Sequence, residues 1–445
     1  MSSEPVVHAS SDLRHAALNT LRGCLGNLVE WFDVYTYTVF VTYFEGQFFD
    51  PADKNSRIYA YAVFAITFVM RPLGSWWFGR FADRHGRRAS LSLSVTIMAG
   101  ASLVVACLPT RGSIGAWAAV LLICCRLVQG FATGGEYGTS ATYMSETATR
   151  DRRGFLSSFQ YVTLVGGQVL AQLVLLILTS VLTDAQLHSW GWRIPFVIGG
   201  LGAFVVLWIR RSMEESLSEG HLQEIAEGKD RQSGSLSELL TRYWRPLLLV
   251  FLITLGGTIA FYVYSVNAPA MVKAAYEGSA GTATWINLAA LVILMVLQPV
   301  YGIISDRIGR KPLLVFFGCG ALVYTSVLIH FLPRTTTPAV SLLLLVGAYV
   351  FLTGYTSINA LVKAEQFPAH VRALGVGLGY GLANSIFGGT APMIYEWAKS
   401  RDAVGAFTAY VTVCVAISLV VYVFFLTNKG DTHLDAEQGH SFRRD

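Results

Sequence analysis

The stretch Gly79-Arg-Phe-Ala-Asp83-Arg-His-Gly86-Arg87-Arg88 recurs in the second half of the chain as Gly302-Ile-Ile-Ser-Asp306-Arg-Ile-Gly309-Arg310-Lys311. Each copy follows a long apolar run and leads directly into another. The repeat indicates that the chain consists of two related halves, each built from several hydrophobic helices. Internal repeats with the working site at their interface are typical of solute transporters. Transport is therefore the first functional hypothesis.

The composition is that of an integral membrane protein. The 445 residues are 53% hydrophobic and only 14% charged, and the mean hydropathy is +0.50, outside the range of a soluble enzyme. Because a spanning helix needs about 20 apolar residues, we expect an all-α protein with about twelve spans in two six-helix bundles. The apolar runs cover residues 18–43, 57–80, 89–108, 115–144, 155–183, 194–210, 245–271, 282–304, 312–332, 339–362, 371–398 and 403–427.

Polar segments and basic residues predict the domain order and the orientation. A polar stretch divides the spans six and six, and the first residues lack a signal-peptide core. With both termini cytoplasmic, cytoplasmic segments hold 22 of the 33 Lys and Arg residues and external segments hold 8, as the positive-inside rule requires. The net charge of +5 thus reflects inside-facing loops and not nucleic-acid binding. The expected units are a cytoplasmic N-terminal segment, the N-terminal bundle, a cytoplasmic linker, the C-terminal bundle and a cytoplasmic tail, at 1–17, 18–211, 212–243, 244–427 and 428–445.

The repeated loop resembles the hallmark motif of the major facilitator superfamily. Further motifs narrow the resemblance to its metabolite:proton symporter family, and several stretches most resemble bacterial α-ketoglutarate permeases. The family motifs are Gly26-Asn-Leu-Val-Glu30-Trp-Phe-Asp33, Arg71-Pro-Leu-Gly, Arg126-Leu-Val-Gln-Gly and Gly134-Gly-Glu136-Tyr137-Gly; the permease-like stretches are 139–146, 159–168, 190–196 and 363–372.

The resemblance implies a multi-pass protein of the bacterial inner membrane that imports a dicarboxylate, such as α-ketoglutarate, together with protons. It implies no enzyme activity and no cofactor, since the proton gradient would drive transport. The expected partners are a small organic anion, protons and the lipid bilayer, with no nucleic acid, and the carrier is expected to be monomeric. The six cysteines and nine histidines show no metal-ligand spacing, and no Walker motif is present.

Buried acids in the N-terminal half are the candidates for proton coupling. Glu30 and Asp33 lie on one face of helix 1, whereas the equivalent span of the second half has no acid. Two nearby carboxylates in a low-dielectric cavity favour the uptake of a proton. The resemblance to sugar–proton symporters pairs Asp33 with Arg126, and the depth of Glu136 suggests a pair with Arg71. The alternative is that these ion pairs only hold helices together.

One cation from each half could bind the two carboxylates of the substrate. Arg71 and Lys363 lie within spans, where unpaired charges usually face a cavity, and Glu365 is two residues from Lys363 and so on another face of the helix. Alternatively, Lys363 reaches the cytoplasmic headgroups. The resemblance places Tyr161 and Gln168 at positions that line the sugar site in related symporters. The full set of further candidates for the substrate site is Arg126, Tyr161, Gln168, Asn27, Tyr137, Tyr262 and Asn359.

The loop motifs are expected to gate the cytoplasmic side. Asp83 and Arg87 can form a charged network with Glu146 when the carrier faces outward, and a second network would repeat it with Asp306, Arg310 and Glu365. A purely topological role for the basic residues would not require Asp and Gly to recur in both copies.

Other functions remain open from the sequence. Within transport, the substrate could instead be citrate or tricarballylate, shikimate, or a zwitterion such as proline or betaine. From other classes, the chain could be a metabolite sensor or a membrane enzyme, although no sensor domain and no nucleophile–base constellation is visible.

Overall fold

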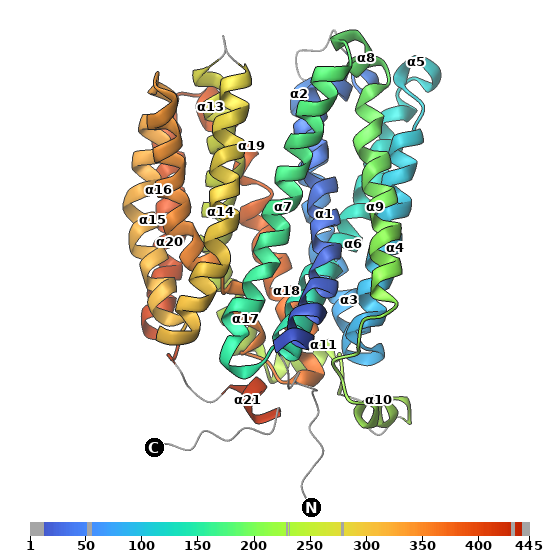
Figure 1. The fold of residues 1–445 in the computed structure, drawn as a ribbon, viewed down its shortest axis with the longest axis vertical. Coiled ribbons are helices and arrows are strands. Elements are labelled where there is room, and N and C mark those ends of the chain that lie inside the picture. The colour runs from blue at the N-terminus through green and yellow to red at the C-terminus, as the bar shows by residue number, and fades with distance from the viewer. Residues whose placement is uncertain are drawn as a thin grey trace, which may run out of the picture.

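The computed structural model of the chain describes residues 13–50, 56–227, 230, 232–276, 280–428 and 432–437, and these contain helices and no strand. Two groups of long helices stand side by side, and both termini lie at the same end (Figure 1). The charge distribution assigns that end to the cytoplasm. Among the described residues, nine helical segments are long and apolar enough to cross a membrane. Helix α1 and the pairs α2–α3 and α18–α19 complete two sets of six, which is the predicted twelve-helix architecture.

The N-terminal half contains six spans joined by short helical turns. The spans are α1 (Leu13–Phe48), α2 (Ser56–Val69) with α3 (Arg71–His85), α4 (Arg87–Cys107), α6 (Trp117–Thr147), α7 (Arg153–Val181) and α9 (Ile194–Arg210). The connecting turns are α5 (Arg111–Ile114), η1 (Arg150–Arg152), α8 (Asp184–Ser189) and η2 (Gly191–Arg193).

Two short helices lie in the linker, and the C-terminal half again supplies six spans. The linker helices are α10 (Glu219–Ala226) and α11 (Leu236–Thr241). The spans are α12 (Trp244–Tyr262) with η3 (Val263–Asn267) and α13 (Ala268–Ala275), α14 (Ala280–Ile308), α15 (Lys311–Phe331) with η4 (Leu332–Arg334), α16 (Pro338–Thr356) with α17 (Asn359–Ala364), α18 (Ala369–Ala383) with η5 (Asn384–Gly388) and α19 (Ala391–Ser400), and α20 (Val404–Phe424). The short helix α21 (His433–Glu437) follows in the tail.

Several spans are interrupted where proline removes a backbone donor. Pro72 follows the break between α2 and α3, and Pro269 and Pro392 stand just after the π-helical turns η3 and η5. Proline lacks the N–H of the helical ladder and collides with the preceding turn, and π-turns are common at functional sites. The interruptions place irregular backbone within the membrane, where only protein-lined positions tolerate it.

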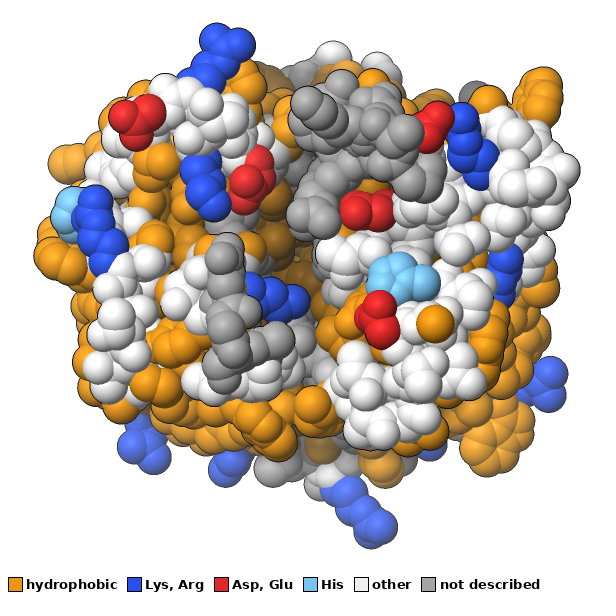
Figure 2. Space-filling model, turned by 90° about the horizontal axis from the view of Figure 1, so that it is seen from above, with side chains coloured by type: hydrophobic (Ala, Val, Ile, Leu, Met, Phe, Trp, Pro, Cys, Tyr) orange, Lys and Arg blue, Asp and Glu red, His pale blue; other side chains and the backbone are white. Residues whose placement is uncertain are grey.

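The two halves meet along two related helix pairs. Helix α3 packs against α18, and α7 packs against α14. The first glycine of each loop motif makes this approach possible, because a Cβ on Gly79 would lie 2.6 Å from the Cα of Leu374, and one on Gly302 would lie 2.6 Å from the carbonyl oxygen of Gly154. The repeat therefore encodes the contact between the halves at the cytoplasmic end. The opposite face is hollowed near its centre, between the halves (Figure 2).

The second glycine of each motif turns the chain into the next helix. Gly86 has φ +94° and Gly309 has φ +95°, a region that side chains with a Cβ rarely adopt. Gly86 is also the residue before α4, and Gly309 stands just before α15. Both glycines recur in the sequence because both copies make the same turn.

Candidate functional site

Asp33 sits in a polar network that joins three helices of the N-terminal half. Its Oδ1 accepts a hydrogen bond from Ser102 (2.6 Å) and its Oδ2 accepts one from Gln129 (2.7 Å). The guanidinium of Arg126 lies 3.6 Å from Oδ2. The expected Asp33–Arg126 pair is thus present, and Ser102 of α4 and Gln129 of α6 hold the carboxylate in place.

The sequence suggested that Glu136 pairs with Arg71, and this prediction is wrong. Its carboxylate forms a buried ion pair with Arg210 at the end of α9, and its Oε2 accepts a hydrogen bond of 2.7 Å from Ser94. Arg210 also donates to the backbone oxygens of Leu91 and Gly23. Nothing in the sequence pointed to Arg210, because Arg210-Arg211 at the end of a span looks like a topology signal.

Arg71 is a buried cation without a carboxylate partner among the described residues. Only 2% of it is exposed, and its Nε and Nη2 have no hydrogen-bond acceptor in that part of the chain. The guanidinium carbon lies 4.0 Å from the centre of the Phe68 ring and 5.2 Å from that of Trp31. Aromatic faces stabilise a cation but leave its donors free, so Arg71 can still bind an anion.

Lys363 is the corresponding buried cation of the C-terminal half, and it too makes no ion pair with any described carboxylate. Its Nζ donates to the hydroxyl of Tyr137 (3.1 Å) and to Oδ1 of Asn359 (2.5 Å). The ring centre of Tyr380 lies 4.5 Å from Nζ, and this ring stacks on Tyr137 of the other half with 3.5 Å between centroids. The alternative that Lys363 reaches the cytoplasmic headgroups is wrong, because its side chain is fully buried in the protein.

Aromatic side chains lie beside both cations. The ring of Tyr380 contacts Lys363, and Tyr380 belongs to α18, which packs against the helix α3 that begins at Arg71. Phe68, which contacts the Arg71 guanidinium, packs edge-on against Tyr262 with 5.6 Å between centroids. Arg71 and Lys363 therefore both contact aromatic residues at the interface of the halves.

The remaining neutral candidates divide into two groups. Tyr161 packs its buried ring against Phe261 of the opposite half, with centroids 5.6 Å apart, and Gln168 donates across the interface to the backbone oxygen of Ser265 (2.8 Å). Asn27 instead lies between α1 and α7, where Trp31, Gln160 and Thr163 occupy its polar atoms. It therefore holds these two helices together and offers no free polar atom to a substrate in this conformation.

The first loop motif closes the cytoplasmic end against the other half. Arg87 binds Asp83 (2.9 Å) and Glu146 (3.1 Å). Asp83 accepts hydrogen bonds from two backbone amides in the second turn of α18, those of Ala373 (3.1 Å) and Leu374 (3.0 Å). The motif thus also contacts a helix of the C-terminal half. The network expected from the sequence contained residues of the N-terminal half alone.

Arg372 adds a second contact across the halves. This α18 residue lies 2.8 Å from Glu146, and it is fully buried. A buried charged group needs such partners to offset its lost hydration. Glu146 therefore binds one arginine from each half.

The second motif repeats the arrangement with the roles of the halves exchanged. Asp306 accepts hydrogen bonds from the backbone amides of Gly154 (2.7 Å) and Phe155 (2.9 Å) at the start of α7. Arg310 lies 3.9 Å from Asp306 and 3.5 Å from Glu365. Glu365 therefore pairs with Arg310 and not with Lys363.

The tail supplies contacts that the sequence did not suggest. Asp435 of α21 lies 2.7 Å from Nη1 of Arg153, the first residue of α7. Glu437 forms an ion pair with Arg372 and accepts a hydrogen bond of 2.7 Å from the amide of Ala369. The polar tail carried no motif that could have identified Asp435 or Glu437.

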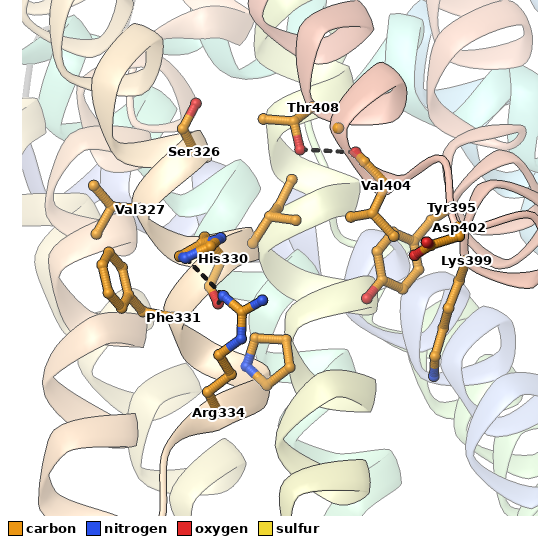
Figure 3. Close-up of a pocket in the computed structure, with 13 residues that line it drawn as sticks. Ser326, Val327, His330, Phe331, Arg334, Tyr395, Lys399, Asp402, Val404 and Thr408 are labelled. Carbon is orange, nitrogen blue, oxygen red and sulfur yellow. Dashed lines mark hydrogen bonds between the residues drawn. The ribbon is translucent and has the colours of Figure 1, made fainter.

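One pocket of the structure lies away from these residues. It has a volume of about 740 Å³ and opens between α15, α19 and α20. Figure 3 shows Arg334, His330, Lys399 and Asp402 around it. None of the predicted site residues lines this pocket, so the charged residues between the halves remain the candidate site.

Comparisons with known proteins agree with this architecture. Residues 20–439 match the model of the sugar (and other) transporter family. The chain is 43% identical over 413 residues to the α-ketoglutarate permease of Escherichia coli (strain K12), covering 93% of this chain and 94% of the relative. It is 29% identical over 401 residues to the proline/betaine transporter of the same strain, covering 88% and 80%.

A solved structure of the proton:xylose symporter XylE, bound to 6-bromo-6-deoxy-D-glucose, has the same fold. The TM-score is 0.77 at 20% identity, and the match covers 95% of this chain and 99% of that chain. The relatives and the fold are those of transporters and not of enzymes. They place the chain in the bacterial inner membrane as a multi-pass protein.

Proposed function

Since the chain belongs to the sugar (and other) transporter family of the major facilitator superfamily, we propose that it is a proton-coupled symporter for a dicarboxylate, most simply α-ketoglutarate. The observation that carries the proposal is the pair of buried cations, Arg71 and Lys363. They come from opposite halves, and neither pairs with a described carboxylate. The site lies between two halves of one chain, so a monomer suffices.

Charge matching explains why the substrate should be a dianion. A dianion that leaves water loses its hydration, and fixed cations must replace that stabilisation. The guanidinium of Arg71 can hold one carboxylate through two hydrogen bonds, and the ammonium of Lys363 can attract the other as a point charge. Because the cations stand on different halves, binding of one molecule draws the halves together. This gives the substrate a physical role in the change of access.

The cytoplasmic contacts support alternating access. Asp83 and Asp306 bind backbone amides of the opposite half, so the two networks must separate before substrate can leave towards the cytoplasm. Helix α18 carries both Tyr380 beside the site and Arg372 in the cytoplasmic network, so a substrate that shifts this helix as it draws the halves together at the site can also loosen the cytoplasmic contacts. The energy for accumulation comes from protons, for which the buried acids of helix 1 are the candidate sites.

A zwitterion is the second candidate, because the proline/betaine transporter is also a relative. A zwitterion has one carboxylate and one cationic group, so it would need one of the two cations and a nearby acid. Glu30 lies within electrostatic reach of Arg71 and could supply that acid. The two candidates therefore differ in their demand for Lys363.

Uptake into proteoliposomes tests the proposal. An inward proton gradient should drive accumulation of labelled α-ketoglutarate, and Lys363→Gln should reduce its uptake at least about tenfold, equivalent to about 1.4 kcal/mol. A monocarboxylate analogue should lose less, since it needs one cation. The matched control is Lys399→Gln, which removes the same charge from an exposed position of α19. Preferred uptake of proline or betaine, or equal losses for mono- and dicarboxylates, would overturn the dicarboxylate assignment.

A further inference from the structure

Glu30 is the buried acid of the N-terminal half that the polar networks leave out. It is 1% exposed, and neither carboxylate oxygen has a hydrogen-bond partner among the described residues. Asp33, one turn later in α1, is held by Ser102, Gln129 and Arg126. The two acids of helix 1 therefore occupy opposite environments.

Burial without a donor favours the neutral form of Glu30. An ionised carboxylate that leaves water without a hydrogen-bonded partner loses several kcal/mol of hydration, whereas the protonated acid loses far less. Asp33 accepts two hydrogen bonds and faces a guanidinium, and these interactions stabilise its anion. In this conformation the geometry suits a protonated Glu30 and an ionised Asp33.

The charged and titratable groups around Glu30 come from both halves. The carboxylates of Glu136 and Asp33 and the guanidinium groups of Arg71 and Arg210 act on it from α6, α1, α3 and α9. Tyr262 of α12 and Tyr380 of α18 also interact with it electrostatically. Arg210 is already committed to Glu136. Among these neighbours, Arg71 is the cation without an ion pair to a described carboxylate, and its Nε and Nη2 have no acceptor in that part of the chain.

We propose that Glu30 binds the transported proton and that its protonation releases Arg71 for the substrate carboxylate. The inference rests on the proposed function, and it selects Glu30 from the buried acids that the sequence offered as candidates for proton coupling. In the ionised state Glu30 attracts Arg71 and repels a dianion. A proton from the external water converts the carboxylate to the neutral acid, so Arg71 can then bind the substrate. When the site opens to the cytoplasm, release of the proton ionises Glu30, which repels the anion. Release of the anion in turn frees Arg71 to stabilise the ionised Glu30, so each release favours the other.

Asp33 has a positioning role in this scheme. Its carboxylate fixes Arg126 and Gln129 on α6, the helix that also carries Glu136 and Tyr137. Removing its charge should weaken this packing and slow transport. It should leave the link between proton and substrate binding in place.

The experiment measures proton uptake when α-ketoglutarate binds to the purified carrier in weakly buffered detergent solution. The wild type should take up a proton, and its Kd should rise about tenfold for each pH unit above the pKa of the proton site, as linkage of one proton to one substrate requires. In Glu30→Gln the proton uptake should vanish and the Kd should no longer depend on pH. Glu30→Asp should restore both, and Asp33→Asn should retain both.

Each outcome separates this inference from the proposed function. If Glu30→Gln still takes up a proton and still concentrates substrate under a proton gradient, Glu30 is not the proton site, although proton symport stands. If Asp33→Asn abolishes the proton uptake and Glu30→Gln does not, the role belongs to Asp33. If the wild type shows neither proton uptake nor pH-driven accumulation of α-ketoglutarate, the proposed function itself fails. The Asp rescue and the fluorescence-detected elution profile of each variant exclude misfolding as the cause.

Discussion

Removal of the two carboxylates of α21 should shift the carrier towards a state open to the cytoplasm. In the structure, Asp435 binds Arg153 at the start of α7, and Glu437 binds Arg372 and the amide of Ala369 at the start of α18. These helices belong to different halves. The double variant Asp435→Asn/Glu437→Gln keeps the size of both side chains and removes both charges, so it weakens a contact that exists only when the halves meet.

The contacts of the two arginines set the size of the effect. A charge-assisted hydrogen bond contributes about 1.5–3 kcal/mol. After the substitution Arg372 still binds Glu146 at 2.8 Å, and Arg153 still interacts with Glu365, so neither cation is left without an acid. The lower end of the range therefore applies to each contact. Glu437 and its partners all belong to the C-terminal side and can stay joined when the halves separate, so only the Asp435–Arg153 contact enters the ratio. Its loss gives about 1.5 kcal/mol, a change of roughly tenfold in the ratio of closed to open molecules.

Distances between spin labels on the two halves report this ratio. Labels at the exposed positions Ala89 of α4 and Ile308 of α14 should give one population in the wild type and a second, longer-distance population in the double variant. The matched control removes two exposed acids of the cytoplasmic end, in Asp151→Asn/Glu219→Gln, and should leave the distribution unchanged. An unchanged distribution in the α21 variant, or an equal shift in the control, would refute the role of the tail.

Further changes test other parts of the fold and the electrostatics. Gly86→Ala should lower the melting temperature, because φ +94° costs a residue with a Cβ about 1–3 kcal/mol, whereas Gly100→Ala, which meets no atom within 4 Å, should not. Arg210→Met should destabilise the protein by about 3–5 kcal/mol by leaving Glu136 uncompensated, and adding Glu136→Gln should recover most of the loss in thermal unfolding. Burial alone would raise the pKa of Asp435, but Arg153 and the hydroxyl of Thr432 lower it below its usual 3.8. The stabilising contact of Asp435 is therefore complete above that value and lost only as the pH falls through the lowered pKa. The difference in spin-label distances between the wild type and Asp435→Asn should thus stay constant between about pH 5 and pH 8.

The sequence predicted the parts of the fold that repeat or that follow from local pattern. Two copies of one motif and about twelve apolar runs were enough for the architecture, because hydrophobic length and repeated glycines act locally. Local pattern could not predict which residues contact each other across the interface of the two halves. Arg372 and Glu437 meet only after helices distant in the sequence have packed, and the Glu136 partner proved to be Arg210 and not Arg71. Estimated depth in the membrane identified which charges are buried, but not which of them face each other.

The buried charges divide into those that have a partner of opposite charge and those whose burial destabilises the fold. Asp33 with Arg126 and Glu136 with Arg210 form hydrogen-bonded pairs, which offset part of the cost of burial. Arg71, Lys363 and Glu30 have no opposite charge bound to them in the described part of the chain, so their burial costs stability without an ion pair in return.

Such a cost is typical of groups whose partners arrive during function. Two cations and one protonated acid together match a dianion and a proton, and both cations contact aromatic residues at the interface of the halves. With both cargoes bound, the site carries two positive charges, two negative charges and a neutral acid. With both absent and Glu30 ionised, one cation is already compensated and the other is held by tyrosine faces. With the proton alone the site has two uncompensated positive charges, and with the dianion alone it has one uncompensated negative charge, whereas the site that holds both is neutral; this neutrality is the physical basis for moving both together.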